Sequence, residues 1–157
     1  MVWAISNNEI EGLGKKERVN NFFFFYSDTS SSSYFQQEKK RIIGIFIDGY
    51  VLPRKKYYYR YSNLNQIELI YKLYLLYNTK FINYVKGVFI IIILDNGNFY
   101  IFNDRHSIKK FFIYRKDQEY IISNKLKIIA ENVNLGFNEE YADLFCLMEH
   151  FIDGLTI

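Results

Sequence analysis

The sequence has little that would cross-link, anchor or export the protein. Its 157 residues include one cysteine, Cys146, so no internal disulfide can form, and a lone thiol favours a reducing compartment. The longest apolar run, Gly87 to Leu94, ends at Asp95 after eight residues, whereas a membrane-spanning helix needs about 20. The N-terminus has no basic stretch followed by an apolar one, so we expect no signal peptide and a cytoplasmic location.

Charge of one sign is also scarce. The formal net charge is +3, and the Lys and Arg residues come in short scattered pairs, which gives no argument for nucleic acid. One basic cluster, RKKYYYRY, runs from Arg54 to Tyr61. Tyrosines beside cations are typical of a surface that holds single-stranded nucleic acid or a peptide, but an exposed edge strand guarded by charges has the same composition. We favour the edge strand.

What the chain does contain is ordinary for a folded domain, except for its aromatic residues. Hydrophobic residues make up 50% and charged residues 24%, which fits one domain with one core. Aromatic residues reach 20%, with 15 Tyr and 15 Phe. Nucleotide bias in the source genome explains this excess as well as a binding surface does, and we favour the bias.

The N-terminal third predicts strands separated by polar loops. The apolar and aromatic runs are bounded by polar or serine-rich stretches, and Asp48-Gly49 marks a turn at the end of the third run. We expect strands at 2–6, 22–28 and 41–52, with loops at 7–21 and 29–40.

The segment 66–77 predicts a helix. Its apolar residues recur three and four apart, which places them on one helical face. Asn65 with Glu68 fits a capping box, and Asn78 suits a left-handed stop. The residues of this face are Ile67, Ile70, Leu73, Tyr74 and Tyr77.

Two hairpins follow the helix. Asn96-Gly97 is a strong signal for a tight turn between strands at 87–94 and 98–103, because both central residues of that turn need a positive φ. Strands at 111–116 and 119–123 follow around a turn at 116–118. Strand 87–94 is apolar at every position, so we expect both of its faces to be covered, as in a layered α+β fold.

A last helix is expected at 138–154, and it carries a weak metal-ligand pattern. Asn138 can cap this helix and Gly154 can end it. Cys146 and His150 lie four residues apart on it, but two ligands do not make a zinc site, and a cysteine is more often a small buried hydrophobe. We expect no metal and no cofactor.

The remaining candidates for chemistry are few. Asp104, Arg105 and His106 could supply an acid or a base, but no nucleophile with a matching partner accompanies them, so we predict a local ion pair at a strand end. The sequence contains no Gly-rich phosphate loop of the common types. The stretch SDTSSSS lacks the glycines of a nucleophile elbow.

From Asn65 to about Glu131 the chain resembles the glutamine amidotransferase domain of asparagine synthetase-type enzymes. QIELIYKLYLLYN is similar to the family helix D-T-E-x-I-x-x-x-Y-x-x-x-G, and the hairpin segment is similar to L-x-G-x-F-A-x-x-x-x-D followed by L-x-x-x-R-D-x-x-G-x-K-P-L-Y-Y. YIISNKLKIIAE is similar to F-x-S-E-x-K-A-L. The matched or adjacent positions are Gly87, Phe89, Asp95, Asp104, Ile108, Lys109, Tyr114, Ser123 and Asn124.

The resemblance implies an N-terminal-nucleophile hydrolase fold, a four-layer αββα sandwich of antiparallel sheets. It also implies one shortened amidotransferase-like domain over residues 1–157, without the synthetase domain that follows it in the family. Active members expose a Cys-Gly N-terminus, whose thiol attacks the glutamine amide while its own α-amine acts as base. Val2 falls at this position and offers no nucleophile, and Ser6 has no adjacent free amine.

The substrate pocket that the resemblance implies has also changed. The family's R-G-P-D loop is missing, and its Asn-Gly-Glu falls on Asp48, Gly49 and Tyr50, so an aspartate would stand where an amide stabilises the oxyanion. The acid that holds the glutamine amine falls on Gln66. The resemblance therefore implies a catalytically inactive domain, with Val2, Asp48 and Gly49 as degenerate equivalents of the catalytic residues.

The resemblance implies a partner as well. We expect the domain to support an asparagine synthetase-like, ATP-dependent enzyme or domain that makes amide or peptide bonds, in asparagine synthesis or in the maturation of a ribosomal precursor peptide. The sequence leaves open whether the chain forms a homo-oligomer. Two alternatives remain: a peptide- or nucleic-acid-binding module that uses Arg54–Tyr61, and an active amidohydrolase with a non-standard nucleophile.

Overall fold

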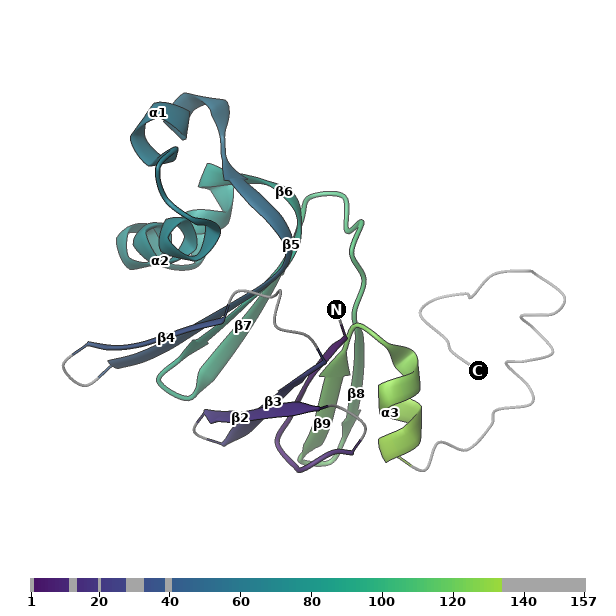
Figure 1. The fold of residues 1–157 in the computed structure, drawn as a ribbon. Coiled ribbons are helices and arrows are strands. Elements are labelled where there is room, and N and C mark those ends of the chain that lie inside the picture. The colour runs from purple at the N-terminus through teal and green to yellow at the C-terminus, as the bar shows by residue number, and fades with distance from the viewer. Residues whose placement is uncertain (1, 12–13, 20, 28–32, 39–40, 134–157) are drawn as a thin grey trace, which may run out of the picture.

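The computed structural model describes residues 2–11, 14–19, 21–27, 33–38 and 41–133 (Figure 1). They form an α+β fold with two antiparallel sheets. The strands are β1 Trp3–Ser6, β2 Lys15–Val19, β3 Phe22–Tyr26, β4 Ser33–Glu38, β5 Arg41–Pro53, β6 Val85–Asp95, β7 Asn98–Asn103, β8 Phe112–Lys116 and β9 Glu119–Ser123. The helices are η1 Lys55–Tyr57, α1 Tyr58–Tyr61, α2 Gln66–Tyr77, η2 Asn78–Tyr84 and α3 Leu126–Asn132.

The N-terminal strand β1 lies in the middle of the first sheet, whose order is β2-β3-β1-β9-β8. Ala4 pairs with Phe25 on one side and with Ser123 on the other. The expected strand at 2–6 is confirmed as β1, and the one expected at 22–28 as β3, which ends at Tyr26. The expected loop at 7–21 is wrong in part, because β2 forms within it and pairs with β3 at the edge of the sheet.

The second sheet has the order β4-β5-β6-β7, with the long strands β5 and β6 at its centre. Two predictions fail here. The expected loop at 29–40 contains β4, which pairs with β5. The expected turn at Asp48-Gly49 does not end the strand, because Gly49 adopts a φ of +119° and lets β5 continue alongside β6 as far as Pro53.

Helix α2 begins and ends as the sequence predicts. The Asn65 side chain accepts a hydrogen bond from the Glu68 N–H at 2.9 Å, and the Glu68 carboxylate accepts one from the Asn65 N–H at 3.1 Å, which completes the capping box. Asn78 ends the helix with a φ of +51°. The Tyr74 hydroxyl donates to Asp95 at 2.8 Å, so the helix is also tied to the end of β6.

The β6–β7 hairpin closes through Asn96 and Gly97, both with positive φ, as the sequence predicts. The alternate side chains of β6 enter two different cores. Ile91 and Ile93 pack with α2, whereas Ile90 and Ile92 pack with Trp3 and other residues of the first sheet. Both faces of β6 are therefore covered, as expected, and each fully buried Ile contributes about 1.5–3 kcal/mol of burial free energy.

A third and smaller core lies on the far side of the first sheet. Ala4 and Phe25 contact Ile128 of α3 there. Figure 1 shows α1 and α2 next to the second sheet and α3 beside β8 and β9 of the first. The two predicted hairpins are consecutive in the chain but belong to different sheets. The β8–β9 hairpin pairs with β1 through β9, whereas β7 pairs with β6 in the second sheet.

Two further predictions concern the segment after β5 and the C-terminal helix. The segment Arg54–Tyr61 is not an edge strand, because after Arg54 it coils into η1 and α1. The helix expected at 138–154, with Cys146 and His150, lies outside the described residues.

Candidate functional site

Asp48 is the centre of a polar cluster where the two sheets meet. One carboxylate oxygen, Oδ1, accepts a hydrogen bond from the Lys109 ammonium at 2.7 Å. The other, Oδ2, accepts from the Trp3 indole N–H at 3.0 Å and from the Asn124 amide at 3.3 Å. We call these four residues the Asp48 clamp.

Each member of the clamp is positioned by a different segment. Asp48 lies on β5, Trp3 begins β1, Lys109 belongs to the connection between β7 and β8, and Asn124 follows β9. Asn124 also accepts from the Trp3 backbone N–H at 3.0 Å, and the Ser123 hydroxyl donates to the Trp3 carbonyl at 2.7 Å. The start of β1 is thus fixed by both its backbone and its side chain.

The clamp is mostly closed to solvent. Trp3 is fully buried against Phe46 and Phe111, and Asp48 is 6% exposed, whereas the Lys109 side chain is 33% exposed. A buried carboxylate is stable only when donors surround it, and Asp48 has three. Its oxygens are therefore engaged within the protein, and the arrangement is suited to holding the sheets together rather than to binding a substrate.

Of the two candidate positions near β1, Val2 has no reactive side chain and Ser6 has no base beside it. The Val2 N–H donates to the Ser27 hydroxyl at 3.1 Å, and the Val2 carbonyl accepts from the Ser27 N–H at 3.0 Å. Ser6 is fully buried at the other end of β1, and its hydroxyl accepts from the Asn8 N–H at 3.1 Å. Neither residue pairs a free hydroxyl or thiol with a base.

The structure brings together only some of the residues that the sequence singled out. Asp48 accepts a hydrogen bond from Trp3, the residue after Val2, whereas Gly49 faces β6 and Tyr50 is 53% exposed. The Gln66 side chain accepts from the Val51 N–H, so it connects α2 to β5 instead of joining the clamp. Trp3 is the member that sequence reasoning missed, because no spacing in the chain relates it to position 48.

The Asp104 turn differs from its prediction. Instead of forming an ion pair with Arg105 or His106, the Asp104 carboxylate accepts from the backbone N–H groups of His106 at 3.0 Å and Ile108 at 3.4 Å. Burial would raise the pKa of Asp104, but these backbone hydrogen bonds outweigh it and lower the pKa below its usual value. The predicted local ion pair is therefore wrong, and Asp104 is a turn-stabilising residue.

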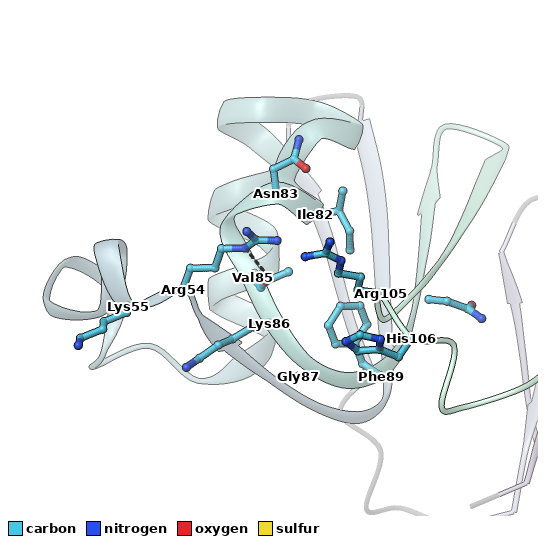
Figure 2. A pocket seen from close by; sticks show the side chains of 11 residues that line it. Arg54, Lys55, Ile82, Asn83, Val85, Lys86, Gly87, Phe89, Arg105 and His106 are labelled. Carbon is cyan, nitrogen blue, oxygen red and sulfur yellow. Dashed lines mark hydrogen bonds between the residues drawn. The ribbon is translucent and has the colours of Figure 1, made fainter.

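Arg105 and His106 instead line a pocket of about 660 Å³ beside the end of β5 and the first half of β6 (Figure 2). We call it the basic pocket. Its lining residues are Arg54, Lys55, Ile82, Asn83, Val85, Lys86, Gly87, Phe89, Asn103, Arg105 and His106.

The described tyrosine side chains of the Arg54–Tyr61 segment, those of Tyr57, Tyr59 and Tyr61, do not form one stacking surface. Tyr61 is buried at 6% exposure, and Tyr57 packs on Tyr84 with ring centroids 5.0 Å apart. Tyr59 alone of these three is open to solvent, at 96% exposure. This arrangement weighs against the stacking platform that a single-stranded nucleic acid would need.

Within the described part of the chain, no three His, Cys, Asp or Glu side chains are grouped to hold a metal ion. No helix in that part is long and apolar enough to cross a membrane. No protein-family model and no curated protein sequence matches the chain.

Proposed function

We propose that this protein is a catalytically inactive glutamine amidotransferase-like domain. The ordered series of motif matches from Asn65 to Glu131 supports the proposal. So does the position of those matches, since Asp95, Asp104 and Lys109 each make a specific contact at the end of a strand or in a turn. The matched residues therefore stabilise the fold through these hydrogen bonds.

The proposed fold is the four-layer αββα sandwich of the N-terminal-nucleophile hydrolases. Three packing relations support this class. The α2 side chains pack on one face of the second sheet, the two sheets share a core that contains Trp3 and Ile90, and Ile128 of α3 packs on the outer face of the first sheet.

The Asp48 clamp is the observation that carries the proposed inactivity. In the resemblance, position 48 should present an amide that stabilises a developing oxyanion. Here it presents a carboxylate whose oxygens are bonded to Trp3, Lys109 and Asn124. Val2, the equivalent of the family's nucleophile, has no reactive side chain and packs in the third core with Ala4 and Phe25.

The proposed role is to support a partner enzyme. By the resemblance, that partner is an asparagine synthetase-like, ATP-dependent domain or protein in the cytoplasm, which forms amide or peptide bonds and acts on asparagine precursors or on a ribosomal precursor peptide. A neighbouring reading frame with the S-G-G-x-D-S pyrophosphatase loop would support this link.

A direct assay of glutamine hydrolysis tests the inactivity. The purified protein is incubated with glutamine and the glutamate formed is measured, with an active glutaminase as the positive control. We expect glutamate release indistinguishable from the protein-free blank, because no hydroxyl or thiol belongs to the Asp48 clamp and its one amine is paired with Asp48. Release above the blank that scales with protein concentration would contradict the proposal.

A further inference from the structure

The basic pocket has the volume and walls of a ligand site. Its 660 Å³ falls in the range of roughly 300–1,000 Å³ that is usual for small-molecule pockets. Its walls come from the end of β5, from η1 and η2, from β6, and from the turn after β7. A site of this size holds more than a single inorganic ion.

The charge of the pocket has one sign. Of the described residues, four Lys and Arg line it together with one histidine, and no Asp or Glu does. None of the four forms a salt bridge with another described residue. The whole chain has 20 Lys and Arg against 17 Asp and Glu, so without these four residues its formal balance would be negative. Among the described residues, the pocket therefore carries positive charge that no salt bridge neutralises. The four are Arg54, Lys55, Lys86 and Arg105.

Two arginines reach the pocket from different segments, and one of them is held by a hydrogen bond. The Arg54 Nε–H donates to the Val85 carbonyl at 3.2 Å, which fixes this side chain and leaves its terminal nitrogens available. Arg105 is presented by the turn that Asp104 stabilises. Figure 2 shows both guanidinium groups directed toward the same space, with His106 beside them. A pair of guanidinium forks suits the tetrahedral oxygens of phosphate.

We propose that the basic pocket binds a small phosphate-bearing molecule of about nucleotide size. Four cations without an acid favour a ligand with at least two negative charges, which a phosphate ester or a diphosphate carries and a single carboxylate does not. Ile82, Val85 and Phe89 supply an apolar wall for the body of such a molecule. A nucleic acid strand fits less well, because Tyr57 and Tyr61 are packed inward. The proposal uses none of the clamp residues, so it stands or falls independently of the amidotransferase-like assignment.

Calorimetric titration with inorganic pyrophosphate and with adenosine monophosphate tests the proposal. The pocket variant Arg54→Gln with Arg105→Gln is compared with Arg115→Gln and Lys116→Gln, which removes two exposed charges of β8 outside the pocket. We expect the wild-type protein to bind at least one of the two probes. The pocket variant should bind at least about tenfold more weakly, because charge-assisted hydrogen bonds are lost, and the β8 variant less than about twofold more weakly.

Further variants and probes keep the test decisive. Arg105→Gln alone removes no hydrogen bond seen within the protein, so it should remain folded and still weaken binding. Citrate, which carries several charges but no phosphate, should bind more weakly than pyrophosphate. The proposal is overturned if neither phosphate probe binds, if both double variants weaken binding equally, or if citrate binds as well as pyrophosphate. Tighter binding of a single-stranded oligonucleotide, lost in the pocket variant, would overturn it in favour of a nucleic-acid site.

Discussion

Replacing Gly49 by alanine should lower the free energy of unfolding by more than about 3 kcal/mol, the sum expected from backbone strain and overpacking. Gly49 has a φ of +119°, which residues with a side chain rarely adopt. A Cβ atom there would lie 2.1 Å from the Val88 carbonyl oxygen and 2.9 Å from the Lys109 Cε. The first of these neighbours is backbone of β6, so it cannot move aside without breaking the β5–β6 pairing.

Gly14→Ala is the matched control for this substitution. A Cβ atom at Gly14 would meet nothing within 4 Å, so we expect a change within about 1 kcal/mol, of either sign. Urea unfolding followed by fluorescence measures both variants, since Trp3 is the single tryptophan and is fully buried. A Gly49→Ala protein within 1 kcal/mol of wild type would show that β5 does not need this backbone conformation.

The second large effect is expected at the Asp48 clamp, where Asp48→Asn and Lys109→Met should each cost about 1–3 kcal/mol. Removal of one partner from a fully buried ion pair costs about 3–5 kcal/mol, and the 33% exposure of Lys109 reduces this. The double variant should lose less than the sum of the two, by at least about 1 kcal/mol, because each single change leaves the other charge unpaired.

An exposed ion pair provides the comparison. Lys127 and Glu131 lie one turn apart on α3 at 3.5 Å, with side chains 81% and 49% exposed, so Lys127→Met should change stability by less than about 0.5 kcal/mol. All variants are measured by urea unfolding at the same pH. If the effects of Asp48→Asn and Lys109→Met add in the double variant, the two groups do not act as a pair.

The parts of the fold that the sequence predicts are those with a local physical signal. The capping box at Asn65 defines the start of α2, and Asn96-Gly97 defines the β6–β7 turn. The missed strands β2 and β4 lie at sheet edges, where backbone pairing to one neighbour is enough and polar sequences such as KKERV give no alternating apolar pattern. The continuation of β5 past Gly49 depends on its pairing with β6, and the local sequence pattern around Gly49 does not predict this pairing.

The sequence identified some individual residues of the candidate site but did not predict that they lie together. Asp48 and Val2 were singled out by resemblance, Lys109 was a position on or beside the motif without a role, and Asn124 stood where the family has an acid. Their meeting depends on β1 lying between β3 and β9, a long-range pairing that spacing along the chain does not encode. Trp3 could be found only after that pairing was known. The basic pocket likewise joins Arg54 to Arg105 across segments that are far apart in sequence.

The central claim, that no nucleophile serves the Asp48 clamp, is tested most directly by intact-protein mass spectrometry after incubation with an electrophilic glutamine analogue. Parallel samples contain excess glutamine, so that labelling at a glutamine site is distinguished from nonspecific alkylation of an exposed side chain. The account predicts no adduct that excess glutamine prevents. A single adduct that glutamine does prevent, mapped to any residue, would contradict it and show a working amidohydrolase.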